Sequence, residues 1–451
     1  MMRRSLQYCA LFFFTILFSK ISAAQSHSAS VTSEMVKKEF LHAWNAYKQY
    51  AWGHDALKPL TKQPHDWYGT SLLMTPIDAF DTMVLMGLKK ESDETKQLIF
   101  DSLSFNKNID VQCFEVTIRL LGGLLSAYQL DGDKRFLILA EDLGKRLLPV
   151  FNSPTGMPYR YVHLQTGNVQ KPINNPAEIG TLLIEFGTLS KLTGDSSYYQ
   201  KAKNALVQLY NRRSSIGLVG SWINVETGLW TNTSSHIGGG IDSYYEYLVK
   251  AWILFGDQDC KTMAEESMKA INRYVADSTQ SGNWYGQIDM NTGKRIGTTF
   301  GSLEAFMPAL LCLTNDIPKA EKIQQSCYTM WNLFNIEPEE IDYTTMNVTA
   351  KEYVLRPEII ESAYYLYHFT DNVRYRLMVE KIFRDLVKYC RNDCGYASLK
   401  DVTTKEKADG MESFFFAETM KYLYLVFAPA GTISVDSVVF NTEAHPIRKT
   451  W

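Results

Sequence analysis

The sequence lacks the short motifs that mark several large enzyme classes. It contains no Gly-x-Ser-x-Gly serine-hydrolase elbow, no Walker-type phosphate loop and no His-Glu-x-x-His zinc motif. Three glycines at 238–240 precede a predicted helix without the spacing of a dinucleotide-binding loop. The 8 histidines show no metal-ligand spacing, and we interpret His54 in "AWGHD" as structural or as an edge of a substrate site. These absences argue against serine-hydrolase, nucleotide and transition-metal chemistry.

The sequence also has no long polar tract, no block of like charges and no linker-like stretch. Such segments would have indicated disorder or a domain boundary. With 451 residues and 45% hydrophobic content, the chain can bury a large core. We therefore predict a single domain over residues 30–451.

The apolar run near the N-terminus is too short to span a membrane. It follows the basic "MMRR" and precedes a small-x-small "SAA" at 22–24, so we predict a signal peptide over residues 1–24, with a retained anchor as the alternative. Its removal takes away Arg3, Arg4 and Lys20, which leaves 43 of the 46 basic residues against 49 acidic ones. This acidic balance argues against a nucleic-acid partner. We expect a secreted or periplasmic protein, or one of the endoplasmic reticulum lumen if the source is eukaryotic.

Cysteine usage leaves the disulfide question open. Loss of Cys9 with the signal peptide leaves six cysteines, at positions 113, 260, 312, 327, 390 and 394. An exported protein permits disulfides, and Cys390–Cys394 and Cys312–Cys327 are the pairs closest in sequence. The sequence does not settle any pairing. A zinc site is disfavoured, because no histidine lies at ligand spacing near these cysteines.

Seven segments share one layout, in which a chain break or tight entry is followed by an acidic residue and then an apolar, aromatic helix. The acidic residues are Asp78, Glu115, Glu178, Asp242, Glu304, Glu358 and Glu412. More polar amphipathic stretches, such as 196–213, lie between them. We predict an all-α fold, an (α/α)7 barrel whose apolar inner helices are covered by amphipathic outer ones. An open α-solenoid is the alternative, but inner helices that are apolar all round need cover on every side.

Short hairpin signals punctuate these units. Residues 161–170, 222–231 and 286–297 each place Thr-Gly between extended residues, which is typical of a tight turn. We expect these β-hairpins on one rim of the barrel. The tail at 431–446 alternates apolar and polar residues, which predicts a final hairpin.

In a closed barrel, the starts of all inner helices meet at one end of the axis, so several carboxylates should face a common cavity. For one residue taken alone, such as Glu304, a helix cap or a partner of the helix dipole is the commoner explanation. Seven such residues together are harder to explain as caps.

Spacing within two of these segments adds detail. Arg119 follows Glu115 by four residues, and Glu361 follows Glu358 by three, so each pair shares a helix face. Arg356 can reach either glutamate of the second pair. Glycoside hydrolysis needs one carboxylic acid to protonate the leaving oxygen and one carboxylate to activate water. Crowding raises the pKa of some carboxyl groups and a neighbouring arginine lowers that of others, which separates acid from base.

These residues resemble glycoside hydrolase family 47, the class I α-1,2-mannosidases. The resemblance runs from residues 42–60 to residues 440–446 and is carried by "PIDAFDTM", "FEVTIRLLGGLLSAY", "DSYYEYLVKA", "LRPEIIES", "MESFFFAETMKYLYLVF" and "NTEAHP". It implies an (α/α)7 barrel with a C-terminal hairpin plugging it. It also implies an exported, Ca²⁺-dependent, inverting exo-α-1,2-mannosidase that removes terminal mannose from high-mannose-type glycans.

The resemblance assigns roles position by position. Glu115 matches the general acid with Arg119 beside it, Glu358 matches the general base, and Asp242 matches a third essential carboxylate. Thr442 matches the Ca²⁺ ligand, through its carbonyl and hydroxyl oxygens. The remaining matches line the mannose pocket or lie beside the ion: Glu178, with Glu185 as the weaker candidate on the same helix, Arg356, Glu361, Phe414, Glu418 and Glu443.

Some positions depart from either branch of the family. "SLEAFMP" (302–308) resembles the degradation-associated branch, whereas "AWGHDALKP" (51–59) resembles the processing branch. Ala305 stands where the processing branch has a disulfide cysteine, and Gly240 where an arginine helps to set branch preference. Branch specificity therefore stays open.

Two other functions stay open as well. One is a mannose-binding, lectin-like protein of the same fold with little turnover, and the other is a different (α/α)-barrel glycosidase or lyase. In each case we expect a monomer that binds a mannose-containing oligosaccharide or another sugar, without nucleic acid and without a membrane after signal cleavage.

Overall fold

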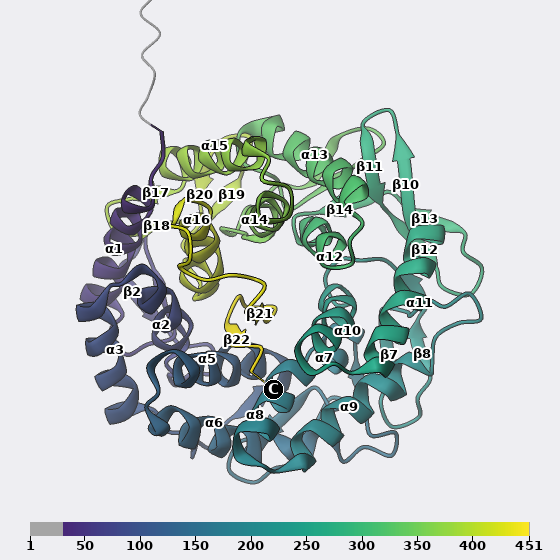
Figure 1. Cartoon of the computed structure of the whole chain (residues 1–451), viewed down its shortest axis with the longest axis horizontal. Helices are drawn as coiled ribbons and strands as arrows, with labels where there is room; N and C mark the ends of the chain where they lie inside the picture. Colours follow the sequence, from purple (N-terminus) through teal and green to yellow (C-terminus); the bar gives the residue numbers. More distant parts are fainter. Residues whose placement is uncertain (1–29, 451) are drawn as a thin grey trace, which may run out of the picture. The chain divides into compact units, whose positions relative to one another are not determined.

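Two concentric rings of helices build the fold. The computed structural model describes residues 30–450, so the predicted signal peptide over 1–24 and Cys9 lie outside the described residues. Of the described residues, 31–450 form one compact unit by their contacts. Figure 1 shows an inner ring around the axis and an outer ring covering it.

Within residues 30–450, seven helices form the outer ring. They are α1 (Ser33–Tyr50), α3 (Lys89–Ser102), α6 (Lys134–Leu147), α9 (Ser196–Tyr210), α11 (Gln258–Tyr274), α13 (Ile317–Phe334) and α15 (Val373–Tyr389). The inner ring consists of α2 (Met74–Met86), α4–α5 (Cys113–Val116, Gly122–Asp131), α7–α8 (Pro176–Gly180, Leu183–Thr193), α10 (Asp242–Phe255), α12 (Met307–Leu313), α14 (Glu358–Thr370) and α16 (Met420–Phe427). The last inner helix, α16, contacts α1 and α2, so the ring is closed. The predicted (α/α)7 barrel is confirmed.

Three of the links from inner to outer helices share one local pattern. Inner helices α5, α8 and α10 each end at a glycine in the left-handed region, and the next residue is an aspartate whose side chain caps the following outer helix. Glycine adopts positive φ without a steric penalty, and aspartate is a preferred N-cap. The pairs are Gly132–Asp133, Gly194–Asp195 and Gly256–Asp257.

Two inner helices contain a π-helical turn. The first, η1 (Thr117–Leu121), joins α4 to α5 and carries Arg119. The second, η4 (Phe415–Thr419), leads into α16 and carries Glu418. The remaining short turns are 3-10 helices, η2 (Leu148–Phe151) and η3 (Leu303–Phe306). Since π turns are rare and often occur at functional sites, both indicate a functional site at the end of the axis where Arg119 and Glu418 lie.

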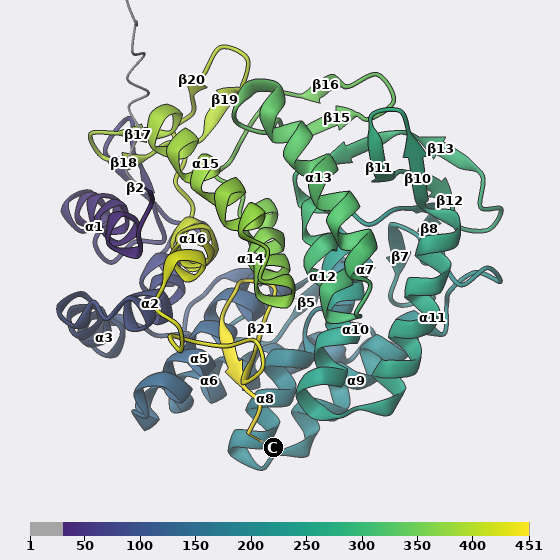
Figure 2. The ribbon, with the colours of Figure 1, turned by 45° about the horizontal axis from the view of Figure 1, so that its top comes forward.

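Small antiparallel sheets lie at the starts of inner helices. The three predicted hairpins are confirmed as β4–β5 (Tyr161–His163, Val169–Gln170), β7–β8 (Trp222–Asn224, Trp230–Asn232) and β12–β13 (Gln287–Asp289, Arg295–Gly297). Their turn glycines, at 167, 228 and 293, all have φ between 70° and 73°. β3 (Asp110–Gln112) runs directly into α4, and β6 (Ile173–Asn174) precedes α7, which places the hairpins on the rim where the inner helices begin (Figure 2).

The other strands also form short pairs or three-stranded sheets. They are β1 (Ala56–Lys58), β2 (Gln63–His65), β9 (Ser234–Ser235), β10 (Ala276–Thr279), β11 (Gly282–Tyr285), β14 (Thr299–Gly301), β15 (Glu340–Asp342), β16 (Asn347–Ala350), β17 (Arg391–Asn392), β18 (Gly395–Tyr396), β19 (Leu399–Asp401) and β20 (Glu406–Lys407).

The C-terminal hairpin lies inside the inner ring (Figure 1). β21 (Val438–Phe440) pairs with β22 (Pro446–Arg448), and all three residues of β21 are buried. β21 contacts α10, and β22 contacts α5. The chain therefore ends by plugging its own barrel, as predicted, and the turn at 441–445 is held among the inner helices.

The six described cysteines are all buried and free, so neither Cys390–Cys394 nor Cys312–Cys327 forms a disulfide. In the part of the chain that the structure describes, no helix is both long and apolar enough to cross a membrane.

Candidate active site

A cavity of about 540 Å³ opens at the end of the axis where the inner helices begin. Its walls come from six inner-helix segments and its floor from the turn of the C-terminal hairpin. Apart from the weaker candidate Glu185, the structure brings together in this one cavity the residues that the resemblance assigned to the site: Glu115, Arg119, Glu178, Asp242, Arg356, Glu358, Glu361, Phe414, Glu418, Thr442 and Glu443.

Not every repeated carboxylate reaches this cavity. Asp78 is fully buried beneath Arg119, Glu304 lines a neighbouring cavity, and Glu412 lines a third one, where it accepts a hydrogen bond from the Trp67 indole at 3.1 Å. Glu185, the weaker candidate, lies outside the cavity and accepts hydrogen bonds from Tyr247 and Asn441. The common helix layout thus places four of the seven carboxylates at the cavity.

Arg119 organises one side of the cavity. Its Nε donates to Glu115 Oε2 at 3.0 Å, its Nη1 bonds Glu443, and the same Nη1 lies 3.7 Å from Asp78 Oδ2. Burial opposes the charge of Arg119, but Glu443, Glu115 and Asp78 outweigh it and raise its pKa above the ordinary value. Arg119 therefore stays charged and fixes the orientation of Glu115, whose side chain is 22% exposed and can reach a bound molecule.

The opposite side carries two carboxyl groups at the first residues of their helices. Burial raises the pKa of Glu358 to about 7 against the lowering effect of Arg356, and burial likewise raises that of Asp242 to about 7. Glu358 Oε2 has no hydrogen-bond partner among the described residues. Each group therefore changes its charge near neutral pH, which is typical of an acid–base site.

Arg356 corrects one expectation. The sequence suggested that it reaches Glu358 or Glu361, but its Nη2 forms an ion pair with Glu339 Oε1 at 2.5 Å. Glu339 lies just before β15 and comes from outside the inner helices, so helix spacing could not have found it. The ion pair holds the guanidinium at the cavity wall, from which it lowers the pKa of Glu358.

The floor gathers three buried carboxyl groups. Burial raises the pKa of both Glu361 and Glu443 to about 8, and it raises that of Glu418 well above the ordinary value. Tyr422 donates to Glu361 at 3.1 Å, and the backbone N–H of Thr442 donates to Tyr247 at 3.3 Å. Oxygen atoms of this kind are the ligands that a hard cation prefers, and Thr442 lines the cavity beside them.

Sequence reasoning missed two charged residues at the cavity, Glu246 and Arg160. Glu246 follows Asp242 by four residues in α10 and pairs with Lys250, so the same-face rule could have found it. Arg160 precedes β4 and pairs with Glu178 at 2.7 Å, a contact across the barrel rim for which the sequence offers no signal.

The cavity continues sideways into a polar groove of about 690 Å³. The two spaces share Trp222, Gly239, Gly240 and Leu303. Gly240 has a φ of +87°, and a side chain there would point toward Asn175. Gly240 therefore places no side chain at the junction of the cavity and the groove. The Trp222 ring lies 5.3 Å from the Arg160 guanidinium and offers a flat face at this junction.

Comparison with known proteins gives one consistent result. The sequence profile of glycosyl hydrolase family 47 matches residues 39–449. A mannosyl-oligosaccharide 1,2-α-mannosidase of Arabidopsis thaliana is 38% identical over 440 residues, covering 92% of this chain and 78% of the relative. The human ER degradation-enhancing α-mannosidase-like protein 2 is also 38% identical, over 92% of this chain and 77% of its own. The solved structure of an α-1,2-mannosidase from Trichoderma reesei superposes with a TM-score of 0.85 at 28% identity, covering 93% of this chain and 100% of that one.

The raised pKa of Glu358 predicts a pH-dependent cost to stability. Its folded-state pKa of about 7 lies above the unfolded value of about 4.5, so the native state binds the extra proton between these limits and loses stability as pH rises. We expect metal-free Glu358→Gln to be about 1–3 kcal/mol more stable than the wild type at pH 8 and nearly equal to it at pH 4.5. Urea unfolding at both pH values measures this.

The exposed Glu352→Gln variant is the matched control and should show the wild-type pH dependence. Equal destabilisation of Glu358→Gln at both pH values would contradict the inferred burial of charge.

Proposed function

The chain belongs to glycosyl hydrolase family 47, and from this membership we propose that it is an inverting exo-α-1,2-mannosidase acting on mannose-containing oligosaccharides. One observation carries the proposal beyond family membership. A carboxylate held by an arginine, Glu115, lines the same closed-ended cavity as two carboxyl groups on other helices, Glu358 and Asp242. A cavity of about 540 Å³ with one open end suits a terminal sugar unit.

In this proposal Glu115 is the proton donor. Arg119 fixes its carboxyl group, and its partial exposure lets it approach the oxygen between the terminal mannose and the next sugar. Glu115 gives its proton to that oxygen as the bond from the anomeric carbon breaks. A water attacks the anomeric carbon from the opposite face and passes its proton to Glu358. Asp242 lies near enough to Glu358 to raise its pKa, which makes it the other candidate for activating the water.

We further propose that Thr442 holds Ca²⁺ at the cavity floor. In residues 30–450 no group of three or more His, Cys, Asp or Glu is arranged to hold a metal directly. The Thr442 hydroxyl and carbonyl would therefore bind the ion together with waters, and Glu361, Glu418 and Glu443 would hold those waters. When bound, the ion would supply positive charge that offsets the acidic floor and favours the ionised form of Glu358.

The polar groove supports an oligosaccharide rather than a single sugar as substrate. It begins at Trp222 and Gly240, beside the cavity, and is lined mainly by polar residues such as Asn232 and Gln287. High-mannose-type glycans fit this chemistry, since their hydroxyls need hydrogen-bond partners and their rings need a flat face. The N-terminal segment supports export of the protein, to the lumen of the endoplasmic reticulum in a eukaryote.

Glu115→Gln tests the proton donor. The variant should fold and still bind mannosides, but it should cleave α-1,2-mannobiose at least about 10²-fold more slowly than the wild type, because its amide cannot protonate the leaving oxygen. On α-mannosyl fluoride, whose leaving group needs no such proton, most of the activity should remain. Steady-state rates on both substrates measure this.

Glu352→Gln is the control. It changes an exposed glutamate that lines neither the cavity nor the groove, and it should cleave mannobiose normally. Near-wild-type cleavage by Glu115→Gln would refute the assignment. A wild-type protein that binds mannobiose without releasing mannose would instead favour the lectin-like alternative.

Removal of metal tests the role of Thr442. We expect EDTA to abolish hydrolysis, Ca²⁺ to restore it, and Thr442→Ala to weaken Ca²⁺ binding in isothermal titration calorimetry, a measurement that does not depend on turnover. Thr442→Ser keeps both oxygens and should bind Ca²⁺ about as well as the wild type. Unchanged hydrolysis by fully demetallated protein would show that the metal role is wrong.

A further inference from the structure

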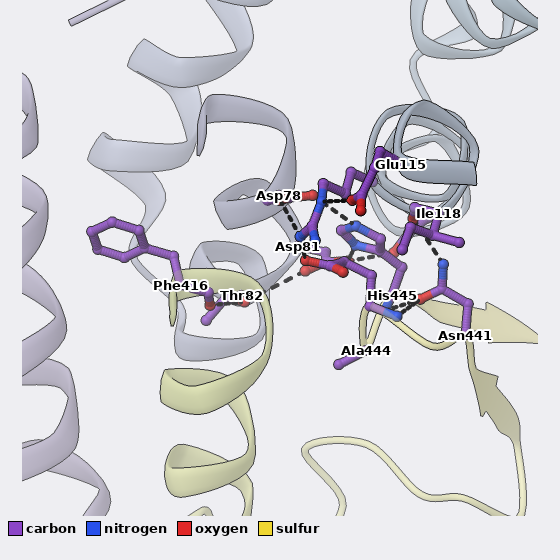
Figure 3. A network of polar contacts seen from close by, with 12 residues as sticks. Asp78, Asp81, Thr82, Glu115, Ile118, Phe416, Asn441, Ala444 and His445 are labelled. Atoms are coloured by element: carbon purple, nitrogen blue, oxygen red, sulfur yellow. Dashed lines mark hydrogen bonds and ion pairs between the residues drawn. The ribbon is translucent and has the colours of Figure 1, made fainter. Parts of the chain in front are cut away.

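His445 lies in the turn of the C-terminal hairpin and is completely buried. Its Nδ1 lies 2.6 Å from Asp81 Oδ2, and its Nε2 lies 3.2 Å from Asp78 Oδ1. Both aspartates come from α2 and are three residues apart, so they share one helix face. Figure 3 shows the imidazole between them. The ring thus ties the last segment of the chain to the first inner helix.

Two carboxylate partners determine the charge of the ring. A neutral imidazole has one N–H, whereas both ring nitrogens of His445 face carboxylate oxygens, so the ring must donate from both and carry a positive charge. Burial by itself lowers the pKa of His445, and Lys421 lowers it too, but Asp81 and Asp78 outweigh both and raise it to about 9. His445 is therefore an imidazolium at neutral pH.

The two aspartates depend on this imidazolium to different degrees. Asp81 also forms an ion pair with the buried Lys421 at 2.8 Å and accepts a hydrogen bond from Ser126 at 2.9 Å. Among the described residues, Asp78 has no hydrogen-bond partner other than His445, and its Oδ2 faces Arg119 Nη1 at 3.7 Å. Loss of the imidazolium would leave Asp81 well paired but would leave Asp78 with Arg119 alone.

Helix α5 leaves space for the ring. A Cβ at Gly122 or Gly123 would come within 3.2–3.3 Å of imidazole atoms and within 2.6 Å of Asn441 Nδ2 or Ile77 Cγ2, respectively. Glycine is an unfavourable residue within a helix. Two successive glycines at the contact therefore indicate that the hairpin turn needs this close approach.

We propose that His445 is a positioning residue for the proton donor, through the chain of contacts from His445 to Asp78, from Asp78 to Arg119 and from Arg119 to Glu115. This inference rests on the proposed function. The imidazolium holds Asp78 in place, and Asp78 limits how far Arg119 can turn away from Glu115 and Glu443. Because Thr442 and Glu443 belong to the same turn, the floor of the cavity and the orientation of its acid are set together.

His445→Gln tests the proposal. Glutamine is neutral and can donate to one of the two aspartates, so Asp78 should draw Arg119 away from Glu115. We expect kcat on α-1,2-mannobiose to fall by about tenfold or more while KM stays within roughly threefold. On α-mannosyl fluoride, which needs no proton for its leaving group, the loss should largely disappear. A hairpin that is merely loosened would impair both substrates equally.

Two further variants separate positioning from folding. Ser126→Ala removes a hydrogen bond from Asp81 without touching Asp78 and should leave kcat on both substrates unchanged. Asp78→Asn keeps the contacts of His445 and Lys421 with Asp81, so it should fold even if His445→Gln does not, and it should reproduce the substrate-dependent loss. The double variant should lose little more than either single one, because both act through one path.

Nitrogen-15 NMR of labelled histidine adds a readout independent of turnover and should show both His445 nitrogens protonated at pH 7.5. A neutral ring, or equal losses on both substrates in Asp78→Asn and in His445→Gln, would overturn the inference while leaving the proposed function intact. A wild-type protein that cleaves neither substrate would refute the proposed function itself.

Discussion

The central constraint on this structure is the burial of many carboxylates at the axis of a helical barrel. An ionised carboxylate away from water is costly unless a cation or several hydrogen-bond donors accompany it. In the cavity wall and beneath the cavity, cations accompany the carboxylates in close ion pairs, such as those of Arg119 with Glu443 and of Lys421 with Asp81. The cations come from different helices, so the pairs also cross-link the inner ring and seat the C-terminal hairpin. The same ion pairs therefore neutralise the buried carboxylates and hold the barrel closed.

Two of the three carboxyl groups to which we assign the chemistry form no close ion pair. Glu358 and Asp242 begin their helices, and burial outweighs the lowering effect of Arg356 and moves their pKa values toward neutrality. Glu115, by contrast, is fixed by Arg119 at the more open side of the cavity. The barrel thus fixes Glu115 by an ion pair, whereas the protonation of Glu358 and Asp242 depends on the charges present in the cavity. A bound cation and a sugar would provide the positive charge and the hydrogen bonds that the protein does not supply to these carboxyl groups. Without them, the buried carboxyl groups reduce the stability of the fold, as is common at functional sites.

Much of this arrangement could be predicted from the sequence, because it depends on helix periodicity. The acidic helix starts predicted Glu115, Asp242 and Glu358, and the tail pattern predicted the hairpin that carries Thr442. The errors lie where contacts cross between elements. Arg356 pairs with Glu339 from a loop, Arg160 reaches Glu178 from the rim, and Asp78 lies under the site. The role of His445 likewise depends on two aspartates more than 360 residues earlier, which no local pattern could indicate. This chain is equally identical, at 38%, to a mannosyl-oligosaccharide mannosidase and to a degradation-enhancing relative. This agrees with its motifs, which combine features of both branches.

We propose that Glu115 and Glu358 act on opposite faces of one sugar, with a water between the sugar and Glu358. Carboxyl groups that work in this way are roughly 6.5–9.5 Å apart and invert the anomeric centre, whereas a covalent mechanism needs about 5–5.5 Å and retains it. Proton NMR during hydrolysis of α-1,2-mannobiose, recorded before mutarotation, tests this most directly. We expect β-mannose to appear first. Initial release of α-mannose would contradict it.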